Sequence, residues 1–474
     1  MLRLLGLFGM VQICFVFLGN ALKSVVTSTI FTDEGTFASF LHISVDKTGI
    51  LVELLVGSAV LALAMTPVIL TPQRARKISF WAAALSVICF GLLGVVMIIN
   101  PSLFTRELAV IATFTLGGFC IAFFAPLAQQ AINSNPDQTS RVALTTIWTS
   151  AQPVAFLITP QLVKYVAQDV GTGQFFLGFA AIPLVIMLLS HWIFPHQTEA
   201  TSTDTPPSVL SRQALGYIFA GLITFEAMTA AVSFVGLDAP ATLGLMGLFA
   251  LIVLAAALRY IRADRTSRLN LPPVALFLML SLFILEMPTT GLYDSAYLVR
   301  HLCSSTLIED RATYGAAAQI LMVFVAGAIF TRNEKSLPYL LGLGILLLII
   351  GTVGYTYYPD LLINADFFYI SKMIASAGMG MVTTVIVALV MAECKDNPLM
   401  TLAPAFVIMF GTEFGLETLE ILFEGVKLMG YGEVAAYRFV FVAQVILVLA
   451  AIPLAVAGVR IKAKPSRPLA RQTA

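Results

Sequence analysis

The chain has 474 residues, of which 59% are hydrophobic and 11% are charged, with a formal net charge of +1 and a mean hydropathy of +0.92. Soluble domains carry about 25% charged residues, so this composition excludes a soluble globular protein and indicates one that crosses a membrane many times. The five cysteines form no CxxC motif and no Cys/His pairing, so we expect no metal site, no disulfide framework and no cofactor.

The apolar segments predict fourteen membrane spans, because a helix needs about 20 apolar residues to cross a hydrocarbon core roughly 30 Å thick. Residues 1–22 resemble a signal peptide, but Lys23 and no small-residue cleavage site follow them, so we expect a retained first span. The first six spans are expected near 5–26, 48–70, 79–99, 107–131, 142–166 and 174–194. The other eight are expected near 214–235, 239–261, 272–293, 312–331, 336–357, 366–391, 399–423 and 436–459.

The basic residues predict the orientation of these spans. With both termini in the cytoplasm, most of the 27 Lys and Arg residues fall in cytoplasmic loops, as the positive-inside rule requires. An odd number of spans would remove this bias. We therefore expect an all-α polytopic membrane protein with fourteen transmembrane helices and two cytoplasmic termini.

The spans also predict how the chain is divided. Residues 1–195 form a six-helix half, 196–213 a cytoplasmic linker, 214–265 two extra membrane helices, 266–460 a second six-helix half, and 461–474 a basic cytoplasmic tail. Two such halves around a midplane site are typical of secondary transporters. The sequence has no HExxH, GxSxG or P-loop motif, which argues against an enzyme and against an ATP-driven pump.

Three stretches carry a family resemblance. Between spans 2 and 3, the segment Thr66–Lys77, followed by Trp81, is similar to the basic cytoplasmic loop that the family has at this place. In span 4, Gly117-Gly118 comes before Pro126 and Gln129, and span 5 runs from Arg141 through Trp148 to Thr159-Pro160. On these stretches and the span count, the chain resembles the major facilitator superfamily, as a divergent member of its 14-spanner drug:proton antiporter branch.

This resemblance implies alternating access and export of amphipathic organic compounds, of the multidrug type, against inward movement of protons. The expected location is the cell inner (plasma) membrane, and the expected partners are a small-molecule substrate, protons and the lipid bilayer. The branch includes exporters that work with a periplasmic adaptor protein, which is a further candidate partner. No nucleic acid is expected.

The departures from the family pattern concern proton coupling. The loop between spans 2 and 3 lacks the family's Gly and Asp, and the expected intramembrane Arg of span 4 falls at Phe114. The glycines of the antiporter motif fall at Thr159, Val163 and Lys164, and the acidic residue of span 1 falls at Lys23. Proton coupling must therefore rest on other acids of this chain.

Several charged residues lie at membrane depth, where an unpaired charge costs from about 2.5 to more than 10 kcal/mol. Lys23, near the predicted outer end of span 1, is expected to pair with Glu53 of span 2. Lys372 of span 12 is expected to pair with Glu417 or Glu420 of span 13. These residues are interpreted as structural ion pairs.

Glu286 and Glu413 have no base at their predicted depth, so they are the candidates for proton coupling. Pro288 and Gly291 follow Glu286 and predict a broken helix beside that carboxylate. Either acid, when ionised, is equally suited to attract a cationic substrate, and a protonated structural role is the third alternative. The expected substrate cavity is lined by Glu286, Asn20, Trp148, Gln152 and Tyr293.

Two alternatives to multidrug export stay open. One is a transporter, in either direction, of one metabolite such as a siderophore, a peptide or an organic anion. The other is a membrane scaffold or sensor that moves no substrate. Glycines around 375–381 and from Gly342 to Gly354 predict close helix packing through small residues.

Overall fold

The computed structural model describes residues 2–43, 48–70, 74–135, 137–194, 255, 272–289, 305–357, 365–393 and 398–463. All regular secondary structure in these ranges is helical. The predicted linker, the two extra spans near 214–235 and 239–261, and Tyr293 lie outside the described residues.

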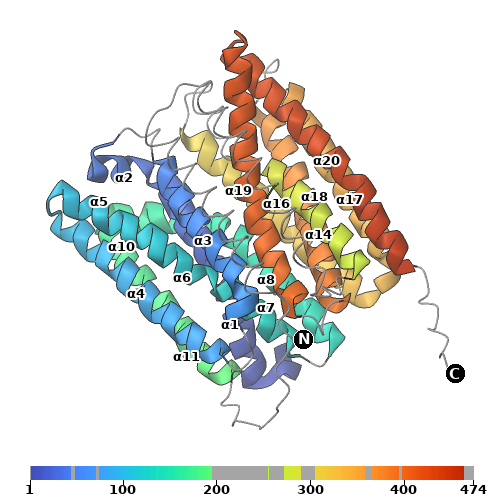
Figure 1. Cartoon of the computed structure of the whole chain (residues 1–474), viewed down its shortest axis with the longest axis horizontal. Coiled ribbons are helices and arrows are strands. Elements are labelled where there is room, and N and C mark those ends of the chain that lie inside the picture. Colours follow the sequence, from blue (N-terminus) through green and yellow to red (C-terminus); the bar gives the residue numbers. More distant parts are fainter. Residues whose placement is uncertain are drawn as a thin grey trace.

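The N-terminal helices occupy one side of the molecule, drawn in blue to green in Figure 1. Two membrane crossings on this side contain a π-helical turn. In the first, Thr113–Gly117 joins α5 to α6, and α7 follows after Phe123; in the second, Val163–Ala167 follows α8. The bounds are α1 (Leu2–Thr32), α2 (Glu34–Leu41), α3 (Gly49–Ile69), α4 (Ala75–Ile99), α5 (Leu103–Ala112), α6 (Gly118–Ala122), α7 (Phe124–Asn133), α8 (Gln138–Leu162), α9 (Gln168–Val170), α10 (Thr172–Phe179) and α11 (Ala181–Ile193).

The C-terminal helices, yellow to red in Figure 1, lie on the other side. Their bounds are α14 (Pro273–Glu286), α16 (Ser305–Arg332), α17 (Leu337–Tyr357), α18 (Ala365–Glu393), α19 (Pro398–Leu428) and α20 (Glu433–Ala463). A 3-10 turn, Met287–Thr289, follows α14 directly.

Every predicted span that falls on described residues contains a helix, and α2 is an additional short helix outside the predicted spans. Nine described helices are long and apolar enough to cross a membrane, and three shorter apolar helices cover Ile50–Thr66, Pro273–Glu286 and Ala403–Gly415. The protein is therefore a multi-pass membrane protein, and the regular structure of its described residues is helical. The total of fourteen spans, the division into halves and the orientation of the termini stay predictions.

Two predicted boundaries differ from the structure in ways that matter for function. Helix α1 continues to Thr32 instead of ending near residue 26, which places Lys23 nine residues, or about 13 Å, from its end. The α-helix of the predicted span near 272–293 already ends at Glu286, where the 3-10 turn containing Pro288 begins. This change of helix type confirms the predicted break next to Glu286.

Small residues bring neighbouring helices into close contact, as the glycine pattern predicts. Between α17 and α18, a Cβ on Gly378 would lie 2.6 Å from the carbonyl oxygen of Gly344, and a Cβ on Gly351 would lie 2.6 Å from that of Ser371. Only glycine permits this separation, and dispersion between the closely packed backbones stabilises the pair.

The two groups of helices meet mainly where α8 packs against α16 and α18 and where α3 and α7 pack against α19. Gly327 of α16 sits directly against the side chain of Thr146, so a larger residue there would collide with it. The hydroxyls of Thr149 and Thr384 are 3.2 Å apart across the α8–α18 contact. A small cavity remains beside this interface.

Candidate functional site

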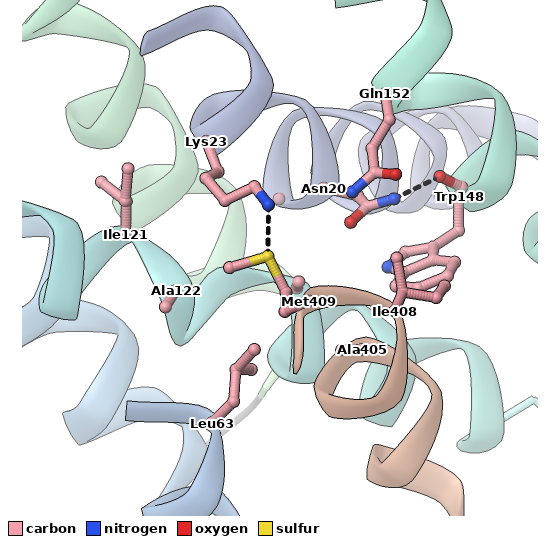
Figure 2. Close-up of a pocket in the computed structure, with 12 residues that line it drawn as sticks. Asn20, Lys23, Leu63, Ile121, Ala122, Trp148, Gln152, Ala405, Ile408 and Met409 are labelled. Carbon is pink, nitrogen blue, oxygen red and sulfur yellow. Dashed lines mark hydrogen bonds between the residues drawn. The ribbon is translucent and has the colours of Figure 1, made fainter. Parts of the chain in front are cut away.

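The cavity lies where α1, α3, α6, α7 and α8 face α19, so both groups of helices contribute to its wall. Its volume is about 20 Å³, which is room for about one water molecule. Its lining is mostly apolar with four larger polar or aromatic side chains, as Figure 2 shows; the residues are Gly19, Asn20, Lys23, Leu63, Ile121, Ala122, Ala125, Trp148, Gln152, Ala405, Ile408 and Met409.

Three residues expected at the substrate site lie together on this cavity. The Asn20 Nδ2 of α1 donates a hydrogen bond of 2.6 Å to the backbone oxygen of Trp148 on α8 (Figure 2). Gln152 follows Trp148 by one helical turn and therefore lies on the same face of α8. The Trp148 side chain is 1% exposed. The structure thus brings Asn20, Trp148 and Gln152 together, and their contact with a substrate stays a prediction.

Lys23 supplies the cavity with a positive charge. It follows Asn20 by one turn of α1, and its Nζ donates to the Sδ of Met409 on α19 (Figure 2). The charges of two carboxylates act on this ammonium group, with Glu413 of α19 contributing more than Glu286 of α14. We call Lys23, Glu286 and Glu413 the charged cluster.

Both acids of the charged cluster are buried. Glu413 is 2% exposed, and Glu286, the last residue of α14, is 7% exposed. The Thr383 hydroxyl of α18 donates to Glu286 Oε1 at 3.4 Å. Burying an ionised carboxylate is costly unless a cation, hydrogen bonds or a proton compensates for its charge. The cluster holds one base and two acids, so its charge depends on how many protons the acids carry.

Two glycines hold α19 against the end of α14 on either side of Glu413. A Cβ on Gly411 would lie 2.9 Å from the carbonyl oxygen of Phe283 and 3.0 Å from the Cβ of Glu286. A Cβ on Gly415 would lie 2.8 Å from the carbonyl carbon of Met287. The sequence signal is Gly-x-x-x-Gly, which marks close helix contacts in membranes and which the sequence analysis of span 13 did not use.

Lys23 was expected to lie near the outer end of its span, and the structure corrects this. Because α1 extends to Thr32, Lys23 reaches the depth of Met409, and Glu413 follows Met409 by one turn of α19. Glu286 and Glu413 therefore share Lys23 as a base, whereas the predicted span boundaries placed Lys23 at the depth of Glu53. Thr383 and Met409 also belong to the site, and no residue motif pointed to either.

The remaining predicted site residues lie apart from the cavity lining. Glu53 is partly buried on α3, and a Lys23–Glu53 pair stays a prediction. The stem of Lys372 packs beside Gly315 of α16. The structure describes the backbone of α19 at 417 and 420 but not these two glutamate side chains, so a pair with Lys372 also stays a prediction.

Known proteins were compared with the chain by sequence and by structure. No family model matches the sequence, and no curated protein matches it significantly. The fold is similar to that of the human organic anion transporter MFSD10 (TETRAN), with a TM-score of 0.62 and 15% identity over 94% of this chain and 99% of that one. It is also similar to the major facilitator superfamily proton:xylose symporter XylE bound to 6-bromo-6-deoxy-D-glucose, with a TM-score of 0.61 and 14% identity over 94% and 95% of the two chains.

The chain has the major facilitator superfamily fold. The agreement extends over nearly the whole length of both solved proteins, so the fold predicted from the three motif stretches is confirmed. At 15% identity the agreement concerns the fold alone, and membership of the 14-spanner antiporter branch stays a prediction. Within this major facilitator fold, the cavity and the charged cluster lie between the N-terminal and C-terminal helices.

Proposed function

We propose that the protein is a secondary active transporter of the inner (plasma) membrane that carries a small amphipathic organic anion together with protons. The observation that carries this proposal is the position of Lys23. Its side chain lines the cavity and is also attracted electrostatically by Glu413 and Glu286. A substrate in the cavity meets the ammonium group, because neither acid is part of the described lining.

The charge of the cluster supports coupling to protons. With both acids ionised, one positive and two negative charges give the cluster a net charge of −1, which repels an anion. An anion that approaches Lys23 competes with Glu413 and Glu286 for the same ammonium group. Its binding therefore favours protonation of the acids, and the anion and the proton load from the same side. This linkage is the requirement for symport.

The size of the cavity supports alternating access. A ligand pocket has a volume of about 300–1,000 Å³, whereas this cavity measures about 20 Å³. The conformation is closed around the site, so α19 and the helices of residues 1–195 must separate to admit a substrate. We propose that residues 1–195 and 266–460 are the two bodies that rock against each other.

Multidrug export against protons is the second candidate, favoured by the apolar lining from Ile121, Ala405 and Ile408. A cationic drug would compete with protons for Glu286 and Glu413, so drug and proton would move in opposite directions. A periplasmic adaptor partner belongs with this candidate. The two functions therefore differ in the direction of the proton flux that accompanies the substrate.

Proteoliposomes with an internal pH dye distinguish these candidates. We expect an inward gradient of benzenesulfonate, the permanently charged anionic probe, to acidify the lumen, while benzenesulfonamide, its neutral analogue, does not. Glu286→Gln and Glu413→Gln should each reduce the acidification by a factor of about one hundred or more, the size of effect expected when a proton-transfer group is lost. Glu424→Gln is the matched control, because this exposed acid on the same helix forms a surface ion pair of 2.9 Å with Lys427.

Other outcomes would overturn the proposal. If an inward gradient of benzyltrimethylammonium, the cationic probe, alkalinises the lumen and benzenesulfonate has no effect, the protein is an antiporter of cations. If both Gln variants keep the wild-type proton flux, the charged cluster does not couple transport to protons. If no probe moves protons through the wild type, the scaffold or sensor hypothesis replaces transport.

A further inference from the structure

A second, larger cavity lies on the outside of the N-terminal helices, beside the first turns of α4. Its volume is about 330 Å³, within the range of ligand pockets. One wall is formed by Arg74, just before α4, and by Lys77, Trp81 and Leu85 of α4. The other is formed by Phe119 of α6 and by Phe123, which links α6 to α7. The proposed transport mechanism does not use this cavity.

Two tryptophans mark the level of the membrane surface at this end of the bundle. A side-chain nitrogen of Arg76, near the start of α4, lies 2.9 Å from His191 Nε2, near the end of α11. This contact brings the start of α4 close to the end of α11. Trp81, which lies five residues after Arg76, is 63% exposed, and Trp192, which directly follows His191, is 67% exposed. Exposed tryptophans of membrane proteins collect at the headgroup level. The start of α4 therefore lies at the membrane–water interface.

The cavity changes character from this interface toward the bilayer centre. Arg74 and Lys77 are both exposed and lie one turn apart on the face of α4 that lines it. Leu85 lies eleven residues beyond Arg74, or about 16 Å along the helix, and about 6 Å beyond Trp81 toward the bilayer centre. The opposite wall is aromatic, with the rings of Phe119 and Phe123 packed edge to face at 5.3 Å.

We propose that this cavity is a binding site for one anionic phospholipid. The headgroup phosphate lies between Arg74 and Lys77, and an acyl chain follows the apolar wall past Trp81 toward Leu85. Two cations with no acid among the described lining residues favour a net negative headgroup over a zwitterionic one. The predicted orientation places this end in the cytoplasmic leaflet, which is the anionic leaflet of a cell membrane.

Native mass spectrometry of the full-length protein tests the site. The protein is titrated with phosphatidylglycerol and, separately, with phosphatidylcholine of identical acyl chains. We expect one tightly bound phosphatidylglycerol in the wild type and weaker phosphatidylcholine binding. Removal of both charges in Arg74→Gln/Lys77→Gln should weaken the phosphatidylglycerol adduct about 30-fold, from roughly fivefold for each basic residue at a membrane surface.

A matched control and a second variant separate the site from general attraction. Arg332→Gln/Lys335→Gln removes two exposed basic residues between α16 and α17 and should keep the adduct. Leu85→Trp leaves both charges in place but fills the apolar part of the cavity, so it should weaken lipid binding. Thermal unfolding of each variant confirms that the fold is intact.

Four results would overturn the proposal. The adduct could survive Arg74→Gln/Lys77→Gln, or the control variant could lose it to the same extent. Glycerol 1-phosphate, which lacks acyl chains, could bind as tightly as the lipid in both wild type and Leu85→Trp, which would make this a site for soluble phosphate. Benzenesulfonate could displace the lipid, which would make the groove a path for substrate. None of these results depends on the direction or coupling of transport.

Discussion

Lys23 of α1 lies at the level of Glu413 of α19, because its Nζ donates to the Sδ of Met409, which precedes Glu413 by one turn of α19. These residues belong to the two groups of helices that border the closed cavity. Their attraction therefore stabilises the closed conformation and must weaken when the groups separate. A substrate anion or a proton on Glu413 would weaken it.

A double-mutant cycle measures this attraction. Lys23→Met removes the base whose charge acts on Glu413 and Glu286. We expect this variant to lose about 3–5 kcal/mol of unfolding free energy, because the carboxylates then stay buried without their cation. Glu413→Gln added to Lys23→Met should restore part of that loss. We expect an interaction free energy of roughly 0.5–3 kcal/mol from denaturant unfolding of the four proteins in detergent. Additive effects would show that the two charges do not stabilise each other.

Gly415 should tolerate no side chain. Its Cβ would meet the Met287 backbone, which cannot move aside as a flexible side chain can. We expect Gly415→Ala to lower the unfolding free energy by about 1–3 kcal/mol and to reduce transport, because α19 must shift away from Glu286. Gly425→Ala on the same helix meets no atom within 4 Å and should stabilise α19 by roughly 0.5–1 kcal/mol. Equal melting temperatures for the two variants would contradict this packing argument.

Glu34, at the start of α2 and beyond the membrane-spanning part of α1, predicts a pH dependence of stability. Burial raises the pKa of its carboxyl group from 4.5 to about 7. The folded protein therefore binds this proton more tightly than the unfolded chain, and the unfolding free energy falls as the pH rises from about 4.5 through 7. Relative to wild type, Glu34→Gln should therefore gain melting temperature between about pH 5 and pH 8. Glu107→Gln on α5, where the side chain is exposed, is the matched control variant.

The predicted topology around residues 196–265 can be tested by labelling. Thr203 belongs to the predicted linker and Arg268 follows the second of the two extra spans. With two spans between them, single cysteines introduced as Thr203→Cys and Arg268→Cys should both react only from the cytoplasmic side. A membrane-impermeant maleimide applied to intact cells and to inverted vesicles distinguishes the two faces, in a background without the five native cysteines. Labelling of the two positions from opposite faces would mean an odd number of spans between them.

Composition and periodicity were sufficient for the membrane class and for the approximate positions of the described helices. A long apolar segment must become a helix in a bilayer, because its backbone groups have no other partners there. The break after Glu286 was also predictable, since Pro288 lies next to it in the chain. The three stretches that resemble the 14-spanner antiporter branch, by contrast, were sufficient only to predict the fold.

The partners of the intramembrane charges could not be predicted from the sequence. Pairing depends on depth, and an error of six residues in the end of α1 shifts Lys23 by about 9 Å, from the level of Glu53 toward that of Glu413. The helix contacts depend in turn on single glycines such as Gly411 and Gly415, whose effect appears only when two backbones meet.

The sequence by itself determined that this chain folds as membrane helices and that a few charges must be sheltered from lipid. These properties follow from the transfer energies of side chains and backbone, which act locally along each segment. Only the tertiary structure decided that Lys23, Glu286 and Glu413 form one cluster beside Asn20 and Trp148. That arrangement results from the rotation, depth and packing of separate helices, which no single segment specifies.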